Sequence, residues 1–316
     1  MNRFFALLAG ASLAGASLAQ SPNCATPGTD NAFLGIQTIR LWPGTAPQAK
    51  GAACKDIPAL TIFEPQQGDA NGSAVIILPG GGYVQLAGVL EGREVADWFT
   101  ARGFRAFILS YRLPSNGYFL PVPLLDARRA IQTVRARALD YHINPNRIVL
   151  IGFSAGGHLA ALAATKFTTG DPNADDPIAR TSSRPDFVVL GYPWIGALGT
   201  DFDHLNYCKS LKVMDQCETL RAAYSPDLFV TKETPPTFIY HTFNDQTVPV
   251  EQTLGFYSAL VKAGVPSELH IFAKGVHGSG LGKGDSALDQ WPDLLETWLR
   301  AQGLLTPDET AAGTRP

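Results

Sequence analysis

Short apolar runs alternate with longer amphipathic segments along most of the chain. The runs have the length and continuous hydrophobicity of strands covered on both faces. They occupy residues 59–63, 74–78, 105–110, 147–152, 187–190, 237–241 and 268–272. Apolar residues at helical spacing predict helices between them. These cover residues 91–102, 123–140, 155–166, 251–263 and 288–301. The alternation predicts an α/β fold with a mostly parallel, doubly wound sheet and helices on both faces.

Two polar stretches interrupt this alternation. Residues 194–235 carry two of the cysteines, and residues 168–184 are dense in Asp, Pro and Ser. The first stretch is too short to bury a core of its own. We therefore expect a cap-like excursion over the edge where the parallel strands end, which is also where ligands bind in such sheets.

Composition and charge exclude several classes of protein. The chain has 316 residues, 45% of them hydrophobic, and a formal net charge of -3. It is too apolar for a disordered chain. A mildly acidic chain with no basic tract is poorly suited to binding nucleic acid, so we expect no nucleic-acid partner.

The first residues have the pattern of an export signal. Arg3 precedes an apolar stretch over residues 4–16, and a small-x-small site ends at Ala19. This pattern predicts a signal peptide over residues 1–19 and a secreted or periplasmic protein. A transmembrane anchor is the alternative, but Gly10 and Gly15 interrupt the stretch. No other segment approaches the ~20 apolar residues of a membrane span, so we expect no stable membrane insertion.

The chain has four cysteines, Cys24, Cys54, Cys208 and Cys217. An even number in an exported protein suggests disulfides, and four cysteines allow three pairings. Because short loops close at the least entropic cost, our hypothesis is Cys24–Cys54 and Cys208–Cys217. None has CxxC spacing, which argues against a metal or redox site.

The most informative motif is G-x-S-x-G at residues 152–156. It follows a predicted strand and opens an Ala-rich helix, which is the context of a nucleophile elbow. Flanking glycines permit the sharp turn that projects Ser154 from the end of the strand. The alternative is a Gly-rich turn that only packs helix against strand.

A second Gly-rich loop, PGGGY at residues 79–83, follows the strand at 74–78. Such a loop presents backbone N–H groups closely to a substrate. We therefore expect Gly81, Gly82 and Ala155 to form an oxyanion hole. The loop has neither GxGxxG nor Gly-Lys-Ser spacing, so it does not indicate phosphate binding. A purely structural turn is the alternative.

The base and the acid follow from the chain order Ser…Asp…His typical of this elbow. His277 lies in a glycine-flexed loop directly after the last predicted strand, and Asp245 lies in the turn after the preceding one. We predict His277 as the base and Asp245 as the acid that holds its tautomer. His158 and His241 are interpreted as packing and strand-end residues. Glu91, Arg112 and Asp126 are interpreted as scaffold groups.

Together these segments resemble α/β-hydrolase esterases of the BD-FAE and acetyl-xylan-esterase type, related to the hormone-sensitive-lipase group. The segments that carry the resemblance are PGGGY (79–83), DARRAI (126–131), GFSAGGH (152–158), RPDF–YP (184–193), HTFNDQTVPVE (241–251) and GVHG (275–278). Pro79 stands where hormone-sensitive-lipase relatives have His. The resemblance covers residues 41–304 and implies an α/β-hydrolase domain there; we expect residues 20–40 to form an N-terminal extension and residues 305–316 a flexible tail.

The expected function is a secreted serine carboxylic-ester hydrolase that acts through an acyl-enzyme on Ser154. The resemblance implies short acyl esters of carbohydrates, such as acetylated xylan, or small-molecule esters as substrates. We expect no cofactor and no metal. A serine peptidase of the same fold and a catalytically inactive hydrolase-fold binding protein are the alternatives.

Overall fold

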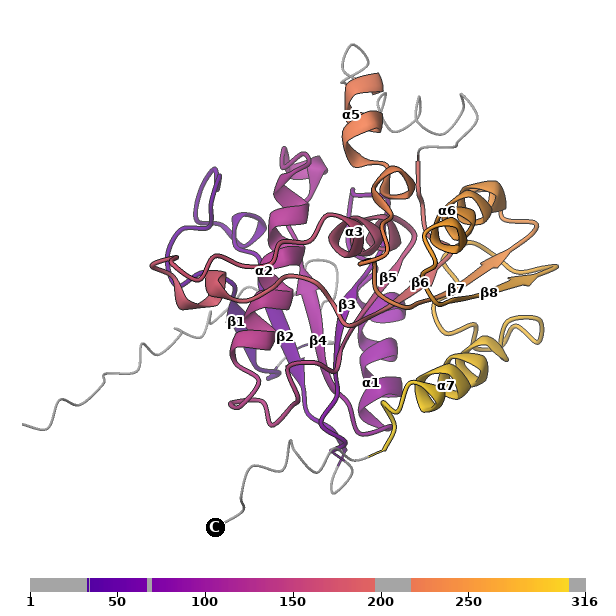
Figure 1. Cartoon of the computed structure of the whole chain (residues 1–316), viewed down its shortest axis with the longest axis horizontal. Helices are drawn as coiled ribbons and strands as arrows, with labels where there is room; N and C mark the ends of the chain where they lie inside the picture. Colours follow the sequence, from indigo (N-terminus) through magenta and orange to yellow (C-terminus); the bar gives the residue numbers. More distant parts are fainter. Residues whose placement is uncertain (1–32, 34, 67–69, 197–216, 307–316) are drawn as a thin grey trace, which may run out of the picture.

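The computed structural model describes residue 33 and residues 35–66, 70–196 and 217–306. A single eight-stranded sheet runs through them in the order β1-β2-β4-β3-β5-β6-β7-β8 (Figure 1). The strands are β1 Thr38–Arg40, β2 Ala59–Phe63, β3 Ala74–Leu78, β4 Arg105–Ser110, β5 Ile148–Phe153, β6 Phe187–Gly191, β7 Thr237–Thr242 and β8 Ser267–Phe272. The predicted fold class, α/β with a mostly parallel sheet, is confirmed.

The two ends of the sheet differ from the expected row of buried parallel strands. Strand β2 pairs antiparallel with both β1 and β4, whereas β4, β3, β5, β6, β7 and β8 are parallel. Strand β1 has three residues, of which only Ile39 is buried. Its sequence therefore has no apolar run that would predict a strand. Strand β8 is the opposite edge, and every one of its residues is at least partly exposed.

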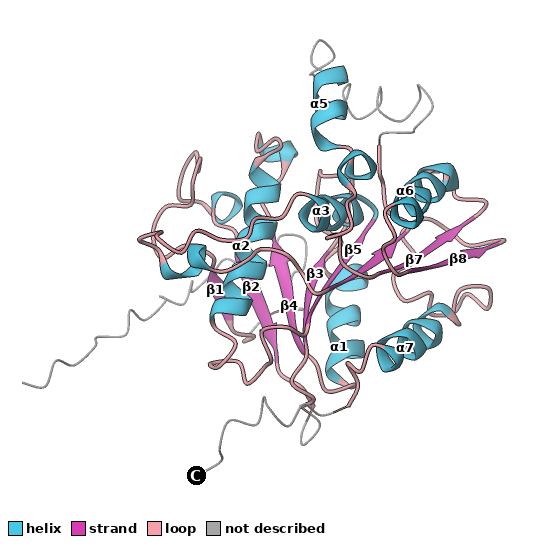
Figure 2. Cartoon of the chain, viewed as in Figure 1, coloured by secondary structure: helices cyan, strands magenta, loops and turns pink. Residues whose placement is uncertain are grey.

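Helices cover both faces of the sheet (Figure 2). They are α1 Glu94–Thr100, α2 Val122–Ala136, α3 Ser154–Thr165, α5 Cys217–Tyr224, α6 Val250–Lys262 and α7 Trp291–Ala301. Side chains of α2, α3 and α6 share one core with one face of the strands. Side chains of α1 and α7 share a second core with the other face. Alternate residues of β3 and β5 enter opposite cores, as the two-residue period of a strand requires.

The helix predicted at 91–102 begins differently from a regular α-helix. A π-helical turn, Val89–Arg93, precedes α1. The predicted helix at 123–140 ends earlier, at Ala136, and the one at 288–301 begins later, at Trp291. A π turn places an extra residue in the helix and is common beside functional sites.

Several predictions fall outside the described residues. They include the signal peptide at 1–19, Cys24, Cys208, and residues 197–216 of the excursion. Cys54 is disulfide-bonded, but the two expected pairs and the domain division stay predictions. Within the described residues, no helix is long and apolar enough to cross a membrane.

Candidate active site

Ser154 stands at the junction of β5 and α3. Its φ is +51°, a left-handed conformation that non-glycine residues seldom adopt. Tight packing surrounds the turn, since a Cβ on Gly156 would lie 2.1 Å from the Leu78 carbonyl oxygen. A Cβ on Gly152 would lie 2.2 Å from the carbonyl oxygen of Gly156. Both glycines of the motif are therefore required by the close approach of backbone to backbone.

The three residues predicted from chain order meet at the carboxyl edge of the sheet. The Nε2 atom of His277 lies 2.8 Å from Ser154 Oγ, and its Nδ1 lies 2.7 Å from Asp245 Oδ2. With the proton on Nδ1, the ring donates to the carboxylate and Nε2 accepts from the serine hydroxyl. The junction of β5 with α3 supplies the serine, and the loops after β7 and β8 supply the aspartate and the histidine.

Asp245 is held by more than His277. Its Oδ1 accepts from the backbone N–H groups of Thr247, at 2.8 Å, and Val248, at 2.9 Å. Burial raises the pKa of Asp245, but hydrogen bonds from His241, His277 and Val248 outweigh burial and hold it well below its usual value. The carboxylate therefore stays ionised wherever a histidine base is neutral.

His241 is a member of this group that the sequence reasoning placed only as a strand-end residue. Its Nε2 lies 3.2 Å from Asp245 Oδ2 and 3.0 Å from the Val248 carbonyl oxygen. Its Nδ1 lies 2.7 Å from the hydroxyl of Thr253 on α6. His241 is fully buried and contacts the same carboxylate oxygen of Asp245 as His277. The sequence feature that could have indicated this contact is the position of His241 four residues before Asp245.

The PGGGY loop lies directly against the serine. A Cβ on Gly80 would lie 2.9 Å from Ser154 Cβ. Gly81 and Gly82 have φ values of +120° and +63°, and a Cβ on Gly82 would meet no heavy atom within 4 Å. Neither of their N–H groups donates a hydrogen bond to a described residue. Ala155 follows the serine at the start of α3. The predicted donors thus lie beside the serine, two in the PGGGY loop and one in the first turn of α3.

The residues that the sequence reasoning interpreted as packing or scaffold groups make structural contacts. His158 lies between the Tyr83 hydroxyl, 2.7 Å from Nδ1, and the Tyr224 carbonyl oxygen, 2.8 Å from Nε2. Arg112 and Asp126 form a buried ion pair at 2.6 Å. Within the described part of the chain, no three His, Cys, Asp or Glu residues are arranged to hold a metal ion.

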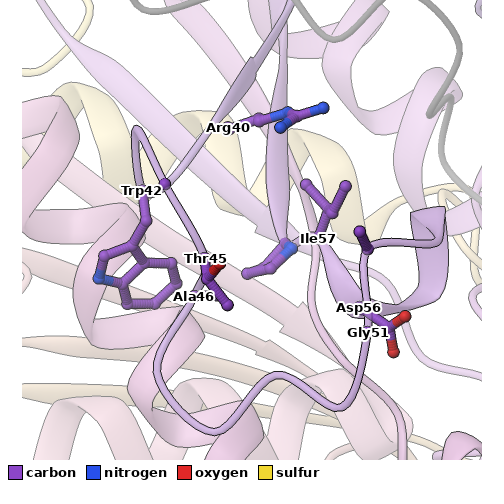
Figure 3. Close-up of a pocket in the computed structure, with 10 residues that line it drawn as sticks. Arg40, Trp42, Thr45, Ala46, Gly51, Asp56 and Ile57 are labelled. Carbon is purple, nitrogen blue, oxygen red and sulfur yellow. The ribbon is translucent and has the colours of Figure 1, made fainter.

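A cavity of about 240 Å³ lies away from these residues, at the β1 edge of the sheet. Arg40 is among its lining residues, and Trp42 lies on one side of it with Gly51 and Asp56 on the other (Figure 3). Asp56 is buried there and accepts hydrogen bonds from Ala53 N–H and the Tyr118 hydroxyl. None of the lining residues belongs to the serine site, so this cavity has no part in its chemistry.

The arrangement around Ser154 is suited to nucleophilic acyl transfer. A serine hydroxyl hydrogen-bonded to an imidazole can lose its proton as it attacks a carbonyl carbon, and a buried carboxylate stabilises the imidazolium that forms. Unpaired N–H groups beside the serine can stabilise the negative charge that develops on the carbonyl oxygen.

Comparisons with known proteins agree on one family. Residues 60–260 match the family model described as BD-FAE. An acetylxylan esterase of Xylanibacter ruminicola is 32% identical over 251 residues, which are 77% of this chain and 48% of that protein. Endo-1,4-beta-xylanase B of Butyrivibrio fibrisolvens is 33% identical over 66% of this chain and 33% of its own length. The chain thus spans about half or less of the length of these curated relatives.

Solved structures also resemble the chain. An acetyl ester-xyloside bifunctional hydrolase from Caldicellulosiruptor lactoaceticus has a TM-score of 0.78 and 40% identity, over 84% of this chain and 96% of that one. A thermophilic esterase of Thermogutta terrifontis, with propionate bound, has a TM-score of 0.69 and 26% identity, over 87% of this chain and 97% of that one.

Proposed function

The chain belongs to the BD-FAE family, an α/β-hydrolase esterase family, and on that premise we propose that it is a secreted serine carboxylic-ester hydrolase. Its substrates are short acyl esters, acetyl above all, on carbohydrates such as acetylated xylan. The observation that carries the proposal is the continuous hydrogen-bonded chain from Ser154 Oγ through His277 to Asp245.

The reaction begins when Ser154 Oγ attacks the ester carbonyl carbon and His277 Nε2 takes its proton. The carbonyl oxygen becomes negative and accepts hydrogen bonds from the N–H groups of Gly81, Gly82 and Ala155. Each such donor lowers the barrier by roughly 2.7–4 kcal/mol. Collapse of this intermediate breaks the ester C–O bond, and His277 passes its proton to the departing alcohol. Water then attacks the acyl-enzyme by the same route and releases the acid.

The substrate class is supported by what the relatives are called. One is an acetylxylan esterase, and another is an acetyl ester-xyloside bifunctional hydrolase. Structures of the Thermogutta esterase have been solved with propionate and with butyrate bound. These names agree on short acyl groups, and those of the first two refer to xylan and to a xyloside.

The export part of the proposal rests on residues 1–19. Cleavage after Ala19 leaves Gln20 as the first residue of the mature protein, and the cysteines then meet an oxidising compartment, in agreement with the disulfide at Cys54. N-terminal sequencing of the exported protein checks the cleavage site.

The activity is tested with the purified protein and its Ser154→Ala variant. Acetate release from acetylated xylan is measured beside turnover of p-nitrophenyl acetate, butyrate and octanoate and of a peptide p-nitroanilide. We expect hydrolysis of the acetylated polymer and of the short esters, with kcat reduced by about 10⁴-fold or more in Ser154→Ala. Turnover of the peptide substrate alone would identify a peptidase, and full activity of Ser154→Ala would exclude the assigned nucleophile.

A further inference from the structure

Glu91 is a buried carboxylate beside the serine site that the reaction described above does not use. It lies in the π-helical turn Val89–Arg93, and only 3% of its surface is exposed. A buried acid without hydrogen bonds costs several kcal/mol, so its partners show what the burial achieves.

Both carboxylate oxygens of Glu91 are bonded to groups of the site. Oε2 accepts from the backbone N–H of Gly80 at 2.7 Å, and Oε1 accepts from the hydroxyl of Tyr192 at 2.7 Å. Gly80 is the first glycine of the PGGGY loop, and Tyr192 directly follows β6. The side chain therefore connects the loop after β3 to the residue after β6.

The peptide group between Pro79 and Gly80 is fixed at both of its polar atoms. Its N–H donates to Glu91, and its carbonyl oxygen accepts from the Tyr111 hydroxyl at 2.7 Å. The plane of this peptide sets the direction in which the chain enters Gly81 and Gly82. Because glycine permits many conformations, an outside constraint is needed to hold these two N–H groups toward one point.

Tyr192 extends the contact from the loop to the base. Its ring meets the ring of His277 edge to face, with 4.9 Å between the centroids. Its hydroxyl accepts from the N–H of Gly280, three residues beyond His277, at 2.9 Å. Glu91 thus lies between the predicted oxyanion donors and the loop that carries the base.

We propose that Glu91 is a positioning residue of the oxyanion hole: its carboxylate fixes the Pro79–Gly80 peptide so that the N–H groups of Gly81 and Gly82 face the developing oxyanion. This inference rests on the proposed function. The role is indirect, since Glu91 acts through the backbone and through Tyr192. The hydrogen bond between a carboxylate and a backbone N–H is among the stronger kinds, which suits a contact that must hold a loop in one conformation.

The test compares Glu91→Gln with the wild type on p-nitrophenyl acetate. The amide has the size of the acid but offers one acceptor and no charge. We expect kcat to fall by about 10- to 100-fold and KM to change by less than about threefold, because an oxyanion hole acts in the transition state. Glu94→Gln is the matched control. Glu94 begins α1 and pairs with Lys283 at 2.8 Å, and its variant should keep wild-type kcat.

A second measurement separates positioning from a merely structural role. In a methyl trifluoromethyl ketone, Ser154 Oγ adds to the carbonyl carbon, His277 takes the proton, and the ketone oxygen becomes an oxyanion. We expect its Ki to rise in Glu91→Gln by the same factor by which kcat/KM falls. If Glu91→Gln is too unstable to assay, Tyr111→Phe is measured instead, because it removes the other hydrogen bond on the Pro79–Gly80 peptide. We then expect kcat/KM to fall and the Ki of the ketone to rise, each by about tenfold.

The outcomes distinguish the two proposals. A wild type that hydrolyses no ester overturns both. A wild type that is active, with an inactive Ser154→Ala variant, supports the function. In that case a Glu91→Gln variant with unchanged kcat, or with reduced kcat and an unchanged Ki for the ketone, overturns the positioning role alone. A parallel change in kcat/KM and Ki supports it.

Discussion

The site consists of two halves that are held in place in different ways. The nucleophile half comprises residues 79–83 and 152–158, and it follows β3 and β5, in which every residue is buried. The base half comprises residues 242–249 and 273–280, and it follows β7 and the exposed edge strand β8. Close backbone contacts at glycines fix the turn of the first half, with hydrogen bonds from Glu91 and Tyr111 on its PGGGY loop, whereas a hydrogen-bond network centred on the Asp245 side chain fixes the second. Local sequence thus specifies the nucleophile, and tertiary contacts specify the base.

The largest effect is expected in the base half, from Asp245→Asn. The amide oxygen can still accept from the N–H groups of Thr247 and Val248, but the NH₂ group then faces His277 Nδ1 and favours the wrong tautomer. We expect kcat for p-nitrophenyl acetate to fall by roughly 10³- to 10⁴-fold, as for the corresponding change in a serine protease triad. The control is the exposed Asp289→Asn, which should keep full kcat. A loss of less than tenfold in Asp245→Asn would assign the acid elsewhere.

In the nucleophile half, Gly156→Ala should act through stability. The new methyl group would lie 2.1 Å from the Leu78 carbonyl oxygen and 2.6 Å from that of Pro79. Because β3 is fully buried and paired on both sides with β4 and β5, we expect a loss of about 3 kcal/mol in the free energy of unfolding, the upper range for overpacking. Urea denaturation measures it. Gly44→Ala is the matched control, since a Cβ there meets no atom within 4 Å. Equal free energies of unfolding for Gly156→Ala and Gly44→Ala would contradict the conclusion that close backbone contacts require glycine at position 156.

The effect that is smallest at neutral pH concerns His158, a histidine of the nucleophile half that serves packing. Burial lowers the pKa of His158 to about 4, against the opposing effect of its hydrogen bond to Tyr224. Above pH 6.5 it is neutral in both the folded and the unfolded chain, so its full contribution to stability is present. As the pH falls toward 4, only the unfolded chain binds the proton, and up to about 3 kcal/mol is lost.

The variant His158→Gln cannot take up that proton, so its unfolding free energy should fall less steeply between pH 7 and pH 4 than that of the wild type. Urea denaturation at several pH values measures the difference. His270→Gln, on the half-exposed edge strand, is the control and should follow the wild type. If the unfolding free energies of wild type and His158→Gln depend on pH in the same way, His158 is not held neutral in the folded chain.

The difference between the two halves of the site also explains which features could be predicted from the sequence alone. Strands β2, β3 and β4 match their predicted bounds because continuous apolar runs end at polar or turn residues. Ser154 and the PGGGY loop carry local motifs. Asp245 and His277 followed from chain order. The contacts of Glu91 with Tyr192 were not predictable, because the two residues are 101 positions apart and no spacing rule connects their segments. Strand β1 was missed because pairing with β2, not its own sequence, makes it a strand.

The left-handed backbone of Ser154, with φ at +51°, has a consequence for the evolution of the chain. A non-glycine residue in this conformation raises the free energy of the folded state by about 1 kcal/mol or more. The protein therefore gives up part of its stability at the residue that attacks the substrate. Selection for stability alone would favour glycine there, so a serine at this position is a trade-off between folding and activity that the buried strands on either side must support.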